Sequence, residues 1–350
     1  MKKKVLLGMS GGVDSSVAAV LLKEAGYDVT GAFIKNWSGE TGDTVSCWIN
    51  ERRDATRVAA ELDIPLVTYD FETDYRQHVV DYLYREYEAG RTPNPDIMCN
   101  KWIKFPLLLR EANKLGYDYI ATGHYARVVK NGEYFDLVKG KDEAKDQSYF
   151  LYTLNQEILS RTLFPVGELT KIEVRAIAEK HNLATAKKPD SQGICFIGEV
   201  NMKDFLKKRI NEKLGDIVDV NGKTIGQHEG IFYYTIGQRH GFLGGAKAAM
   251  YIVEKDAKNN RLVVTDKKDD PRLYKKELML EEVSWTTEVP KLPAKINVKA
   301  RYRAADAPAI LDFKDNNFIL TFDEPQRAIT PGQSTVIYDG DICLGGGIIQ

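Results

Sequence analysis

The chain contains few cysteines and no long apolar segment. Its 350 residues include four cysteines, and no two of them form a Cys-x-x-Cys pair. A structural zinc site built from paired thiolates is therefore not expected. Because the longest apolar runs fall far short of the ~20 residues that a membrane-spanning helix needs, we also expect no membrane partner.

The net charge leaves a nucleic-acid partner open, and the start of the chain does not favour a targeting segment. The formal net charge is −1, so any binding of nucleic acid would depend on local patches. Residues 1–7 combine lysines with a short apolar run, but glycines and an aspartate follow at once. A signal peptide is therefore not expected, and no Arg- and Ser-rich transit leader precedes the first predicted strand. We expect a cytoplasmic protein.

Apolar strands alternate with amphipathic helices over the first part of the chain. We predict strands at 3–8, Val29–Ile34, Ile64–Tyr69 and Tyr119–Thr122, and helices at 14–26, Glu51–Leu62, Tyr75–Tyr87 and Phe105–Leu115. This alternation predicts an α/β fold with a doubly wound parallel sheet. Ligands bind such sheets beyond the carboxyl ends of the strands. The loops at Gly8, Ile34, Asp70 and Gly123 should therefore share one rim.

The pattern changes after about residue 200. Residues 201–213 predict a basic helix, either a solvated face or an RNA-facing one, and residues 215–270 are glycine-rich with short strands. From Lys295 onward, polar and apolar residues alternate in short segments separated by turns, which is typical of a small β-barrel or sandwich. We predict an α/β catalytic domain at 1–205, a small central domain at 206–275 and a C-terminal β-barrel at 276–350.

The segment after the first strand has the residues of an anion-binding loop. Gly11 and Gly12 permit backbone angles closed to other residues and let the main chain approach an anion closely. Ser10 and Ser15 can donate hydroxyl hydrogens, and the following helix presents unpaired N–H groups with partial positive charge. The alternative is a plain strand-to-helix turn in which Asp14 caps the helix. The run Ser-Gly-Gly-Val-Asp-Ser is far more specific than such a turn, and it favours a pyrophosphate-binding loop.

This run resembles the pyrophosphatase (PP) loop of enzymes that cleave ATP to AMP and pyrophosphate. Further segments resemble the tRNA-specific 2-thiouridylases (MnmA/TrmU family). They are residues 33–37 (FIKNW), 90–100 (GRTPNPDIMCN), 123–127 (GHYAR), 145–151 (KDQSYFL), 190–197 (DSQGICFI) and 345–349 (GGGII). The resemblance covers the chain in order, and it implies a PP-loop catalytic domain followed by a small central domain and a β-barrel.

The resemblance also implies a reaction, that of a tRNA-uridine 2-sulfurtransferase. Enzymes of this family replace the 2-oxygen of the wobble uridine in certain tRNAs by sulfur. A uracil oxygen is a poor leaving group, so ATP first adenylates it with release of pyrophosphate, and AMP departs when sulfur attacks. The implied partners are tRNA and a persulfide-donating protein, either a cysteine desulfurase or a sulfur relay carrier. We expect Mg²⁺ with ATP, without identified protein ligands.

The resemblance assigns residues to each step. ATP is expected on Gly8, Met9, Ser10, Gly11, Gly12, Val13, Asp14, Ser15, the main chain of Ile34, and Gly123. Cys195 matches the position that receives sulfur as a persulfide, and Cys99 matches the nucleophile that helps to release it, leaving a Cys99–Cys195 disulfide for reduction. Both cysteines follow polar, loop-like stretches, so we expect them to be exposed. Cys47 and Cys343 are expected to be buried thiols.

Ten residues resemble family positions that contact the target base or tRNA. They are Asn94, Pro95, Asp96, His124, Lys145, Asp146, Gln147, Arg301, Tyr302 and Gln333. Asp96 could assist proton transfer or position the base, or it could cap a helix. Basic residues there could contact phosphates, and Tyr302 could stack on an unpaired base. His124 could instead be structural. One departure is Trp102, where the family has glutamate.

Two other classes of protein stay open. Ligases and amidotransferases share the loop but transfer nitrogen; they need no cysteine pair, and no glutaminase domain is visible in the sequence. A tRNA-binding protein with a relic nucleotide site is the second alternative, and the intact Ser10, Gly11, Gly12 and Asp14 argue against it. Release of pyrophosphate that depends on tRNA would distinguish a thiolase from a small-molecule ligase.

Overall fold

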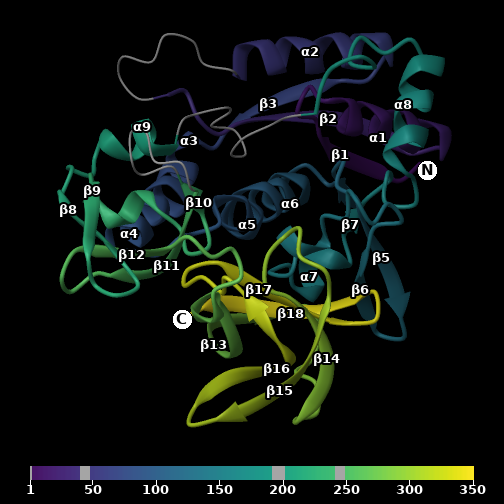
Figure 1. Ribbon diagram of the computed structural model, residues 1–350. Helices are drawn as coiled ribbons and strands as arrows, with labels where there is room; N and C mark the ends of the chain where they lie inside the picture. Colours follow the sequence, from purple (N-terminus) through teal and green to yellow (C-terminus); the bar gives the residue numbers. More distant parts are fainter. Residues whose placement is uncertain (1, 40–47, 191–201, 241–248) are drawn as a thin grey trace.

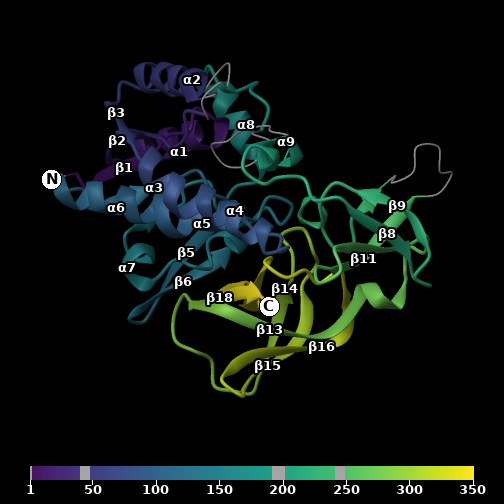
Figure 2. The same ribbon diagram turned by 90° about the vertical axis from the view of Figure 1, so that its left-hand side faces the viewer.

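Three β-sheets organise the chain, each formed mainly by a different stretch of sequence (Figure 1). The structure is a computed structural model that describes residues 2–39, 48–190, 202–240 and 249–350. Figures 1 and 2 place a five-stranded parallel sheet at one end, a second sheet to one side, and a barrel at the other end. The predicted order of an α/β part, a central part and a β-barrel is confirmed.

The parallel sheet has the strand order β3-β2-β1-β4-β7. Its strands are β1 (Lys4–Gly8), β2 (Asp28–Lys35), β3 (Leu66–Asp70), β4 (Tyr119–Ala121) and β7 (Thr162–Leu163). All neighbouring strands run parallel. The interior of β1 and β2 is buried on both faces, which is why these strands consist of continuous apolar residues rather than alternating ones.

One face of the parallel sheet is covered by α1 (Val13–Glu24), α2 (Trp48–Glu61) and α8 (Lys171–Lys180). Helix α1 ends just before Gly26, whose φ of +85° is the left-handed conformation common at helix C-termini. Helix α8 begins with a capping box, in which Thr170 and Glu173 each satisfy the other's backbone N–H. Residues of all three helices share one core cluster with Phe33 of β2.

The other face is covered by a continuous series of helices. They are α3 (Glu72–Tyr75), the π-helical segment η1 (Arg76–Val80), α4 (Asp81–Glu88), α5 (Pro95–Cys99), the π-helical segment η2 (Asn100–Lys104) and α6 (Phe105–Lys114). The helix predicted at Tyr75–Tyr87 is therefore present but interrupted by a π-helix. Both views show α5 and α6 between the parallel sheet and the barrel (Figures 1 and 2).

Helix α5 corrects an expectation about Cys99. The Asn94 side chain caps this helix by accepting a hydrogen bond of 3.4 Å from the Ile97 N–H, and Pro95 occupies the first helical turn. Asparagine at the cap followed by proline favours a helix start, because proline lacks an N–H that would be unpaired there. Cys99 therefore lies on a helix and not in a loop.

The central sheet has the order β10-β11-β12-β8-β9. Its strands are β8 (Gly215–Asp219), β9 (Thr224–His228), β10 (Arg239–His240), β11 (Met250–Asp256) and β12 (Arg261–Thr265), accompanied by the 3₁₀ turn η4 (Ile231–Tyr233). Helix α9 (Met202–Lys207) precedes this sheet and is shorter than the basic helix predicted at 201–213. Residues 208–213 are not helical, so the prediction was wrong in its extent.

The C-terminal barrel is formed by six strands and closes through pairing of β13 with β18. The strands are β13 (Tyr274–Trp285), β14 (Ala294–Lys299), β15 (Ala307–Lys314), β16 (Asn317–Arg327), β17 (Ser334–Asp339) and β18 (Ile342–Ile349), and the short 3₁₀ turn η5 (Pro271–Leu273) leads into β13. Asp315 and Asn316 both have positive φ in the tight turn between β15 and β16, as that turn type requires.

A hairpin from the first part of the chain extends the barrel sheet. Strands β5 (Ala126–Asn131) and β6 (Tyr134–Lys139) pair with each other, and β6 also pairs with β18 at Leu137 and Val138. The elements η3 (Ser148–Phe150) and α7 (Gln156–Leu159) follow. The predicted boundaries at 205/206 and 275/276 remain predictions, and this hairpin shows that sheet pairing crosses them.

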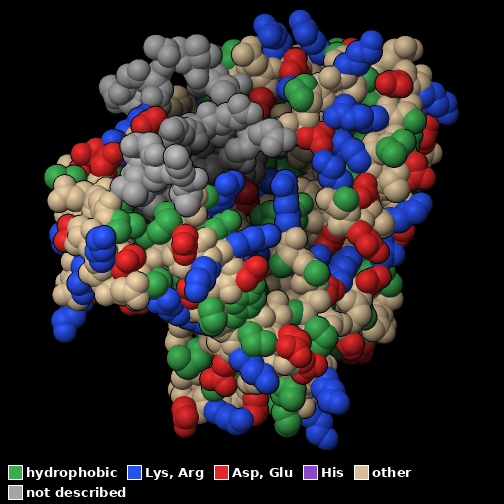
Figure 3. Space-filling model, viewed as in Figure 1, with side chains coloured by type: hydrophobic (Ala, Val, Ile, Leu, Met, Phe, Trp, Pro, Cys, Tyr) green, Lys and Arg blue, Asp and Glu red, His purple; other side chains and the backbone are tan. Residues whose placement is uncertain are grey.

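The surface carries both signs of charge. On the face shown in Figure 3, Lys and Arg side chains are interspersed with Asp and Glu, without one large area of a single sign. This fits the net charge of −1. Among the described residues, no helix is both long and apolar enough to cross a membrane.

Candidate functional site

The turn between β1 and α1 is held in one conformation by its own residues. Gly11 has a φ of +72°, and a Cβ atom there would lie 2.2 Å from the Glu51 carbonyl oxygen, so only glycine fits. The Ser15 hydroxyl donates to the Gly12 carbonyl over 3.1 Å and accepts from the Ser10 N–H over 3.2 Å. The turn is thus held in place at the N-terminus of α1, where backbone N–H groups favour an anion.

Three predicted ATP positions meet at this rim. A Cβ atom on Gly123, just after β4, would lie 2.6 Å from the Ser15 nitrogen, so the β4 loop lies directly against the first turn of α1. The Met9 N–H donates to the Ala32 carbonyl of β2 over 2.9 Å, and Ile34 lies two residues further on. The structure therefore brings the loops at Gly8, Ile34 and Gly123 together, as the parallel-sheet pattern predicts.

A network of charged side chains borders the loop. The Lys171 amine lies 2.6 Å from Asp14 Oδ1 and 2.8 Å from Asp190 Oδ1, and the Tyr125 hydroxyl donates to Asp14 over 2.7 Å. The Lys145 amine lies 2.7 Å from Asp190 Oδ2. Burial raises the pKa of the Asp190 carboxyl, but the hydrogen bonds from Lys145 and Lys171 outweigh it and lower that pKa to about 2. Asp190 is therefore ionised at neutral pH.

Two of the lysines at this loop are not predicted from the sequence. Lys171 is one, and Lys188 is the other: its amine lies 2.9 Å from the Gly11 carbonyl oxygen and 2.7 Å from Asp54 Oδ2. Both come from segments far along the chain, so no local spacing could place them beside Gly11. The lysine directly after the Thr170 capping box and the pair at 187–188 were the available signals. Their amines supply positive charge where phosphate would bind.

His124 is held as a neutral imidazole. Its Nδ1 lies 2.7 Å from the Thr122 hydroxyl oxygen, and its Nε2 lies 3.4 Å from the Lys104 amine. Since an ammonium group can only donate, Nε2 accepts and Nδ1 carries the proton. Burial, followed by the charge of Lys104, lowers the pKa of His124 well below 6.5. His124 is 9% exposed, so its predicted tRNA contact stays a prediction.

Helix α5 carries both Asp96 and Cys99. Asp96 lies in the first turn of α5, where Asn94 and not Asp96 is the cap. Cys99 is 0% exposed and shares a core cluster with Ile34, so the expectation that it is exposed is wrong for this structure. The Lys104–His124 contact connects the segment after Cys99 to the loop that lies against α1. Cys195 and Cys47 lie outside the described residues, whereas Cys343 is buried as expected.

The barrel holds the segment before α5. The Gln333 side-chain amide donates to the Thr92 carbonyl over 2.8 Å, and the Thr92 N–H donates to the Pro331 carbonyl over 3.0 Å. A Cβ atom on Gly332 would lie 2.9 Å from the Thr92 nitrogen, which shows how closely the two backbones approach. The loop that carries Asn94 is therefore positioned by the turn before β17.

Several predicted tRNA-contacting residues have partners within the chain. An Arg301 terminal nitrogen donates to the Ile236 and Ala328 carbonyls and to the Thr330 hydroxyl. The Tyr302 ring packs against Phe150, with ring centroids 4.3 Å apart. Asp146 accepts from the Gly140 and Ser148 N–H groups, and the Gln147 side-chain oxygen accepts from the Tyr125 N–H. The segments around 145–150 and 301–302 thus meet, and their contact with tRNA stays a prediction.

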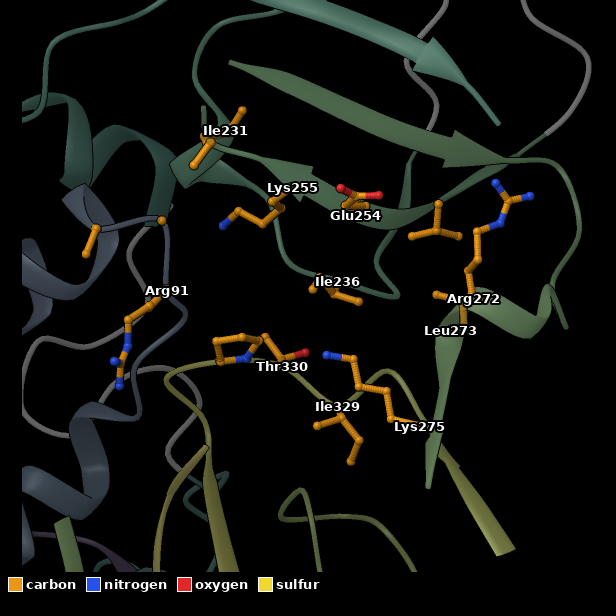
Figure 4. Close-up of a pocket in the computed structure, with 15 residues that line it drawn as sticks. Arg91, Ile231, Ile236, Glu254, Lys255, Arg272, Leu273, Lys275, Ile329 and Thr330 are labelled. Atoms are coloured by element: carbon orange, nitrogen blue, oxygen red, sulfur yellow. The ribbon is translucent and has the colours of Figure 1, made fainter. Parts of the chain in front are cut away.

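Two cavities lie near these segments. One of about 690 Å³ lies beside the junction of the β5–β6 hairpin and the barrel, and both Asp146 and Arg303 line it. The other, of about 430 Å³, lies where α4, the central sheet and the barrel meet. Figure 4 shows Lys255 reaching into this second cavity from one side, with Thr330 and Lys275 on the other.

Trp102 lies on the surface beside α5. Its side chain is 44% exposed and stacks on His78, with ring centroids 5.2 Å apart and an interplanar angle of 19°. The Lys101 amine lies 5.3 Å from the same ring centroid. The departure from glutamate at this position therefore changes the surface next to Cys99 and not the packing of the core.

A metal site of the protein's own is not visible in the described part of the chain. No group of three or more His, Cys, Asp or Glu side chains there is placed to hold an ion. Asp14 is the carboxylate within the loop, and it already contacts Lys171 and Tyr125.

Fold and site together define a nucleotide-binding α/β protein with an anion-binding loop after its first strand. The chain matches three family descriptions: a tRNA methyl transferase HUP domain at residues 3–199, a tRNA methyl transferase PRC-barrel domain at 203–266 and an aminomethyltransferase beta-barrel domain at 275–349. It is similar over its full length to proteins named tRNA-specific 2-thiouridylase MnmA.

Two such relatives come from Pseudomonas fluorescens and Pseudomonas entomophila. Each is 49% identical to the chain over 355 aligned residues, which covers 100% of this chain and 94% and 95% of the relatives. The chain belongs to the tRNA-specific 2-thiouridylase (MnmA) family. Among solved structures, a 4-thiouridine synthetase in complex with RNA and ATP aligns with a TM-score of 0.39 and 18% identity over 59% of this chain and 50% of that chain.

Proposed function

We propose that this protein replaces the 2-oxygen of the wobble uridine in tRNA by sulfur, with ATP activating the oxygen and a cysteine persulfide supplying the sulfur. One observation carries the proposal. The turn at Gly123 and His124 lies against the anion-binding loop and also contacts Lys104, in the helical segment that follows Cys99, and the chain matches the 2-thiouridylase family from end to end. Both halves of a thiolation reaction would thus act at one rim.

In the first step, the uracil O2 attacks the α-phosphorus of ATP and pyrophosphate leaves. The loop at Gly8–Ser15 would hold the departing phosphates on backbone N–H groups at the start of α1. Lys171 and Lys188 lie beside the loop and would offset the negative charge of the pyrophosphate. Since the described residues offer no metal cluster, we expect Mg²⁺ to be held mainly by phosphate oxygens and water.

In the second step, the terminal sulfur of a Cys195 persulfide attacks C2 of the adenylated uracil and AMP leaves. The sulfur is then joined to both the base and Cys195. The Cys99 thiolate attacks the Cys195 sulfur, which forms a Cys99–Cys195 disulfide and releases the 2-thiouridine. A two-electron reductant returns both cysteines to thiols.

The test separates activation from sulfur transfer. Wild-type protein with unmodified tRNA, ATP and a persulfide donor should yield 2-thiouridine, measured by mass spectrometry of digested tRNA. Cys99→Ser and Cys195→Ser should yield none, but both should still release pyrophosphate when tRNA is present, because adenylation needs no sulfur. Cys47→Ser is the matched control and should thiolate normally. Wild-type levels of 2-thiouridine from Cys195→Ser would refute the sulfur step.

The same assay addresses the nitrogen-transferring ligases that share the loop. A small-molecule ligase would release pyrophosphate without tRNA, whereas the proposed reaction should need tRNA for every turnover. Pyrophosphate release that ignores tRNA would therefore overturn the proposed substrate.

A further inference from the structure

Asn36 has a buried side-chain amide with unfilled hydrogen-bonding capacity. It follows β2 directly, is 1% exposed, and neither its Nδ2 nor its Oδ1 has a hydrogen-bond partner among the described residues. In that part of the chain it is the one residue with two such buried atoms. Buried polar groups are nearly always satisfied in native proteins, so an amide of this kind indicates a ligand.

The position of Asn36 places it at the ligand-binding rim. It comes one residue after the carboxyl end of the parallel strand β2, whose Ala32 carbonyl accepts from the Met9 N–H just before the anion-binding turn. Ala32 and Ile34 belong to the core cluster that contains Cys99, whereas Phe33 belongs to the cluster with α1. Side chains alternate along a strand, so Ala32 and Ile34 lie on the side of the sheet that the helices from α3 to α6 cover.

Lys35, the last residue of β2, lies at the edge of the sheet between its two faces. Its amine lies 2.8 Å from Asp70 Oδ2, 3.1 Å from Glu72 Oε2 of α3 and 5.5 Å from the ring centroid of Trp48 of α2. By the alternation of β2, Asn36 continues the side of Ala32 and Ile34, whose core cluster includes Cys99. The phosphate-binding turn belongs to the α1 side, where Gly123 lies against Ser15.

We propose that the Asn36 amide binds the target uracil through its N3–H and O4 atoms. The amide oxygen would accept from N3–H while the amide nitrogen donates to O4, which are adjacent groups on the base edge. This pairing leaves O2 unoccupied and directed to the neighbouring α-phosphate, as the first chemical step requires. The inference rests on the proposed function and adds a base-binding residue to it.

The test uses a variant in which function and stability should change in opposite directions. Asn36→Leu removes an amide that the unliganded protein leaves unpaired, so the thermal midpoint should stay equal or rise. The kcat/KM for tRNA thiolation should fall about tenfold or more, because two hydrogen bonds to the base are lost. The KM for ATP should not change. Asn36→Ala provides the same comparison with a smaller side chain.

Asn155→Leu is the matched control. The Asn155 side chain caps α7 by accepting from the Ile158 N–H over 3.0 Å, so its loss should lower the thermal midpoint and leave thiolation unchanged.

Two results with active wild-type enzyme would overturn the inference. One is a lower thermal midpoint with unchanged activity per folded molecule in both Asn36 variants, which would show a structural role. The other is a raised KM for ATP with normal dependence on tRNA, which would assign the amide to adenine. Absence of 2-thiouridine from the wild-type protein would instead refute the proposed function itself, and the inference with it.

Discussion

The close contact between the β4 loop and α1 requires glycine at position 123, because there is no room for a Cβ atom. A Cβ atom there would lie 2.6 Å from the Ser15 nitrogen and 2.7 Å from the Asp14 carbonyl carbon, and both are backbone atoms that cannot turn aside. Its φ is not in the left-handed region, so alanine would meet a steric conflict and not a conformational one. The β4 loop would have to move away from α1.

We therefore expect Gly123→Ala to reduce tRNA-dependent pyrophosphate release by about 100-fold, since displacements near 1 Å at a reacting centre have effects of that size. Release of labelled pyrophosphate from ATP measures it. Gly116→Ala is the control: Gly116 has a φ of +71° but open space around it, so alanine should cost about 1 kcal/mol of stability and leave activity intact. Normal pyrophosphate release from Gly123→Ala would contradict the prediction.

The identity of Cys99 was predictable from the sequence, but its burial was not. The motif around it identified the residue, but its polar neighbours indicated a loop, and the structure shows a buried helix position. Local polarity did not reveal this because burial of Cys99 comes from contacts with distant elements. The Asn94–Pro95 pair was a helix-start signal that could have corrected the expectation.

At the scale of elements, the loop before α5 is supported from outside its own domain. Gln333 donates to the Thr92 and Pro93 carbonyls over 2.8 and 3.4 Å. Gln333→Leu should therefore lower thiolation at saturating tRNA several-fold, because α5 loses its positioning, while the affinity for tRNA stays the same. Filter binding and single-turnover thiolation measure the two quantities.

Gln326→Leu is the matched control, since the Gln326 amide donates to the Glu324 carbonyl of its own strand. A fall in tRNA affinity with unchanged turnover would assign Gln333 to direct tRNA contact instead of positioning.

Helices and strands were predictable from the sequence, but the pairing of strands that are far apart in the chain was not. Strands such as β1 and β2 and the helices α2 and α6 follow from apolar periodicity, because burial of one face or of a whole strand leaves a local pattern. The β5–β6 hairpin left a local signal too, the Gly132-Glu133 turn, in which Gly132 has a φ of +60°. Its pairing with β18 left none, because the register of distant strands depends on the assembled sheet. The π-helical segments beside Cys99 also have no known sequence pattern here.

At the scale of the whole molecule, Lys255 lines the cavity where α4, the central sheet and the barrel meet. Its amine donates to the Tyr234 carbonyl over 2.7 Å, and burial lowers its pKa to about 8. The unfolded chain has the higher lysine pKa of 10.5, so between pH 8 and 10.5 the unfolded state binds more protons. Stability associated with Lys255 therefore rises with pH across that window, and the cost of burying its charge is fully present below pH 8.

Lys255→Met should accordingly stabilise the protein at pH 7 by about 1–3 kcal/mol, an advantage that disappears by pH 10.5. Thermal melting at a series of pH values measures the difference between variant and wild type. Lys275→Met, at the exposed side of the same cavity, is the control and should not alter the pH dependence. If the stability difference between variant and wild type were the same at pH 7 and pH 10.5, the buried charge of Lys255 would not be its cause.

The pairing of β6 with β18 also affects how the protein is made. Strand β6 leaves the ribosome about two hundred residues before its partner, so the sheet edge at Leu137 and Val138 waits through the synthesis of the whole barrel. An uncovered strand edge is open to pairing with other chains. The interval between the two strands is therefore the period in which the nascent protein most needs a chaperone, and its length is set by the rate of translation.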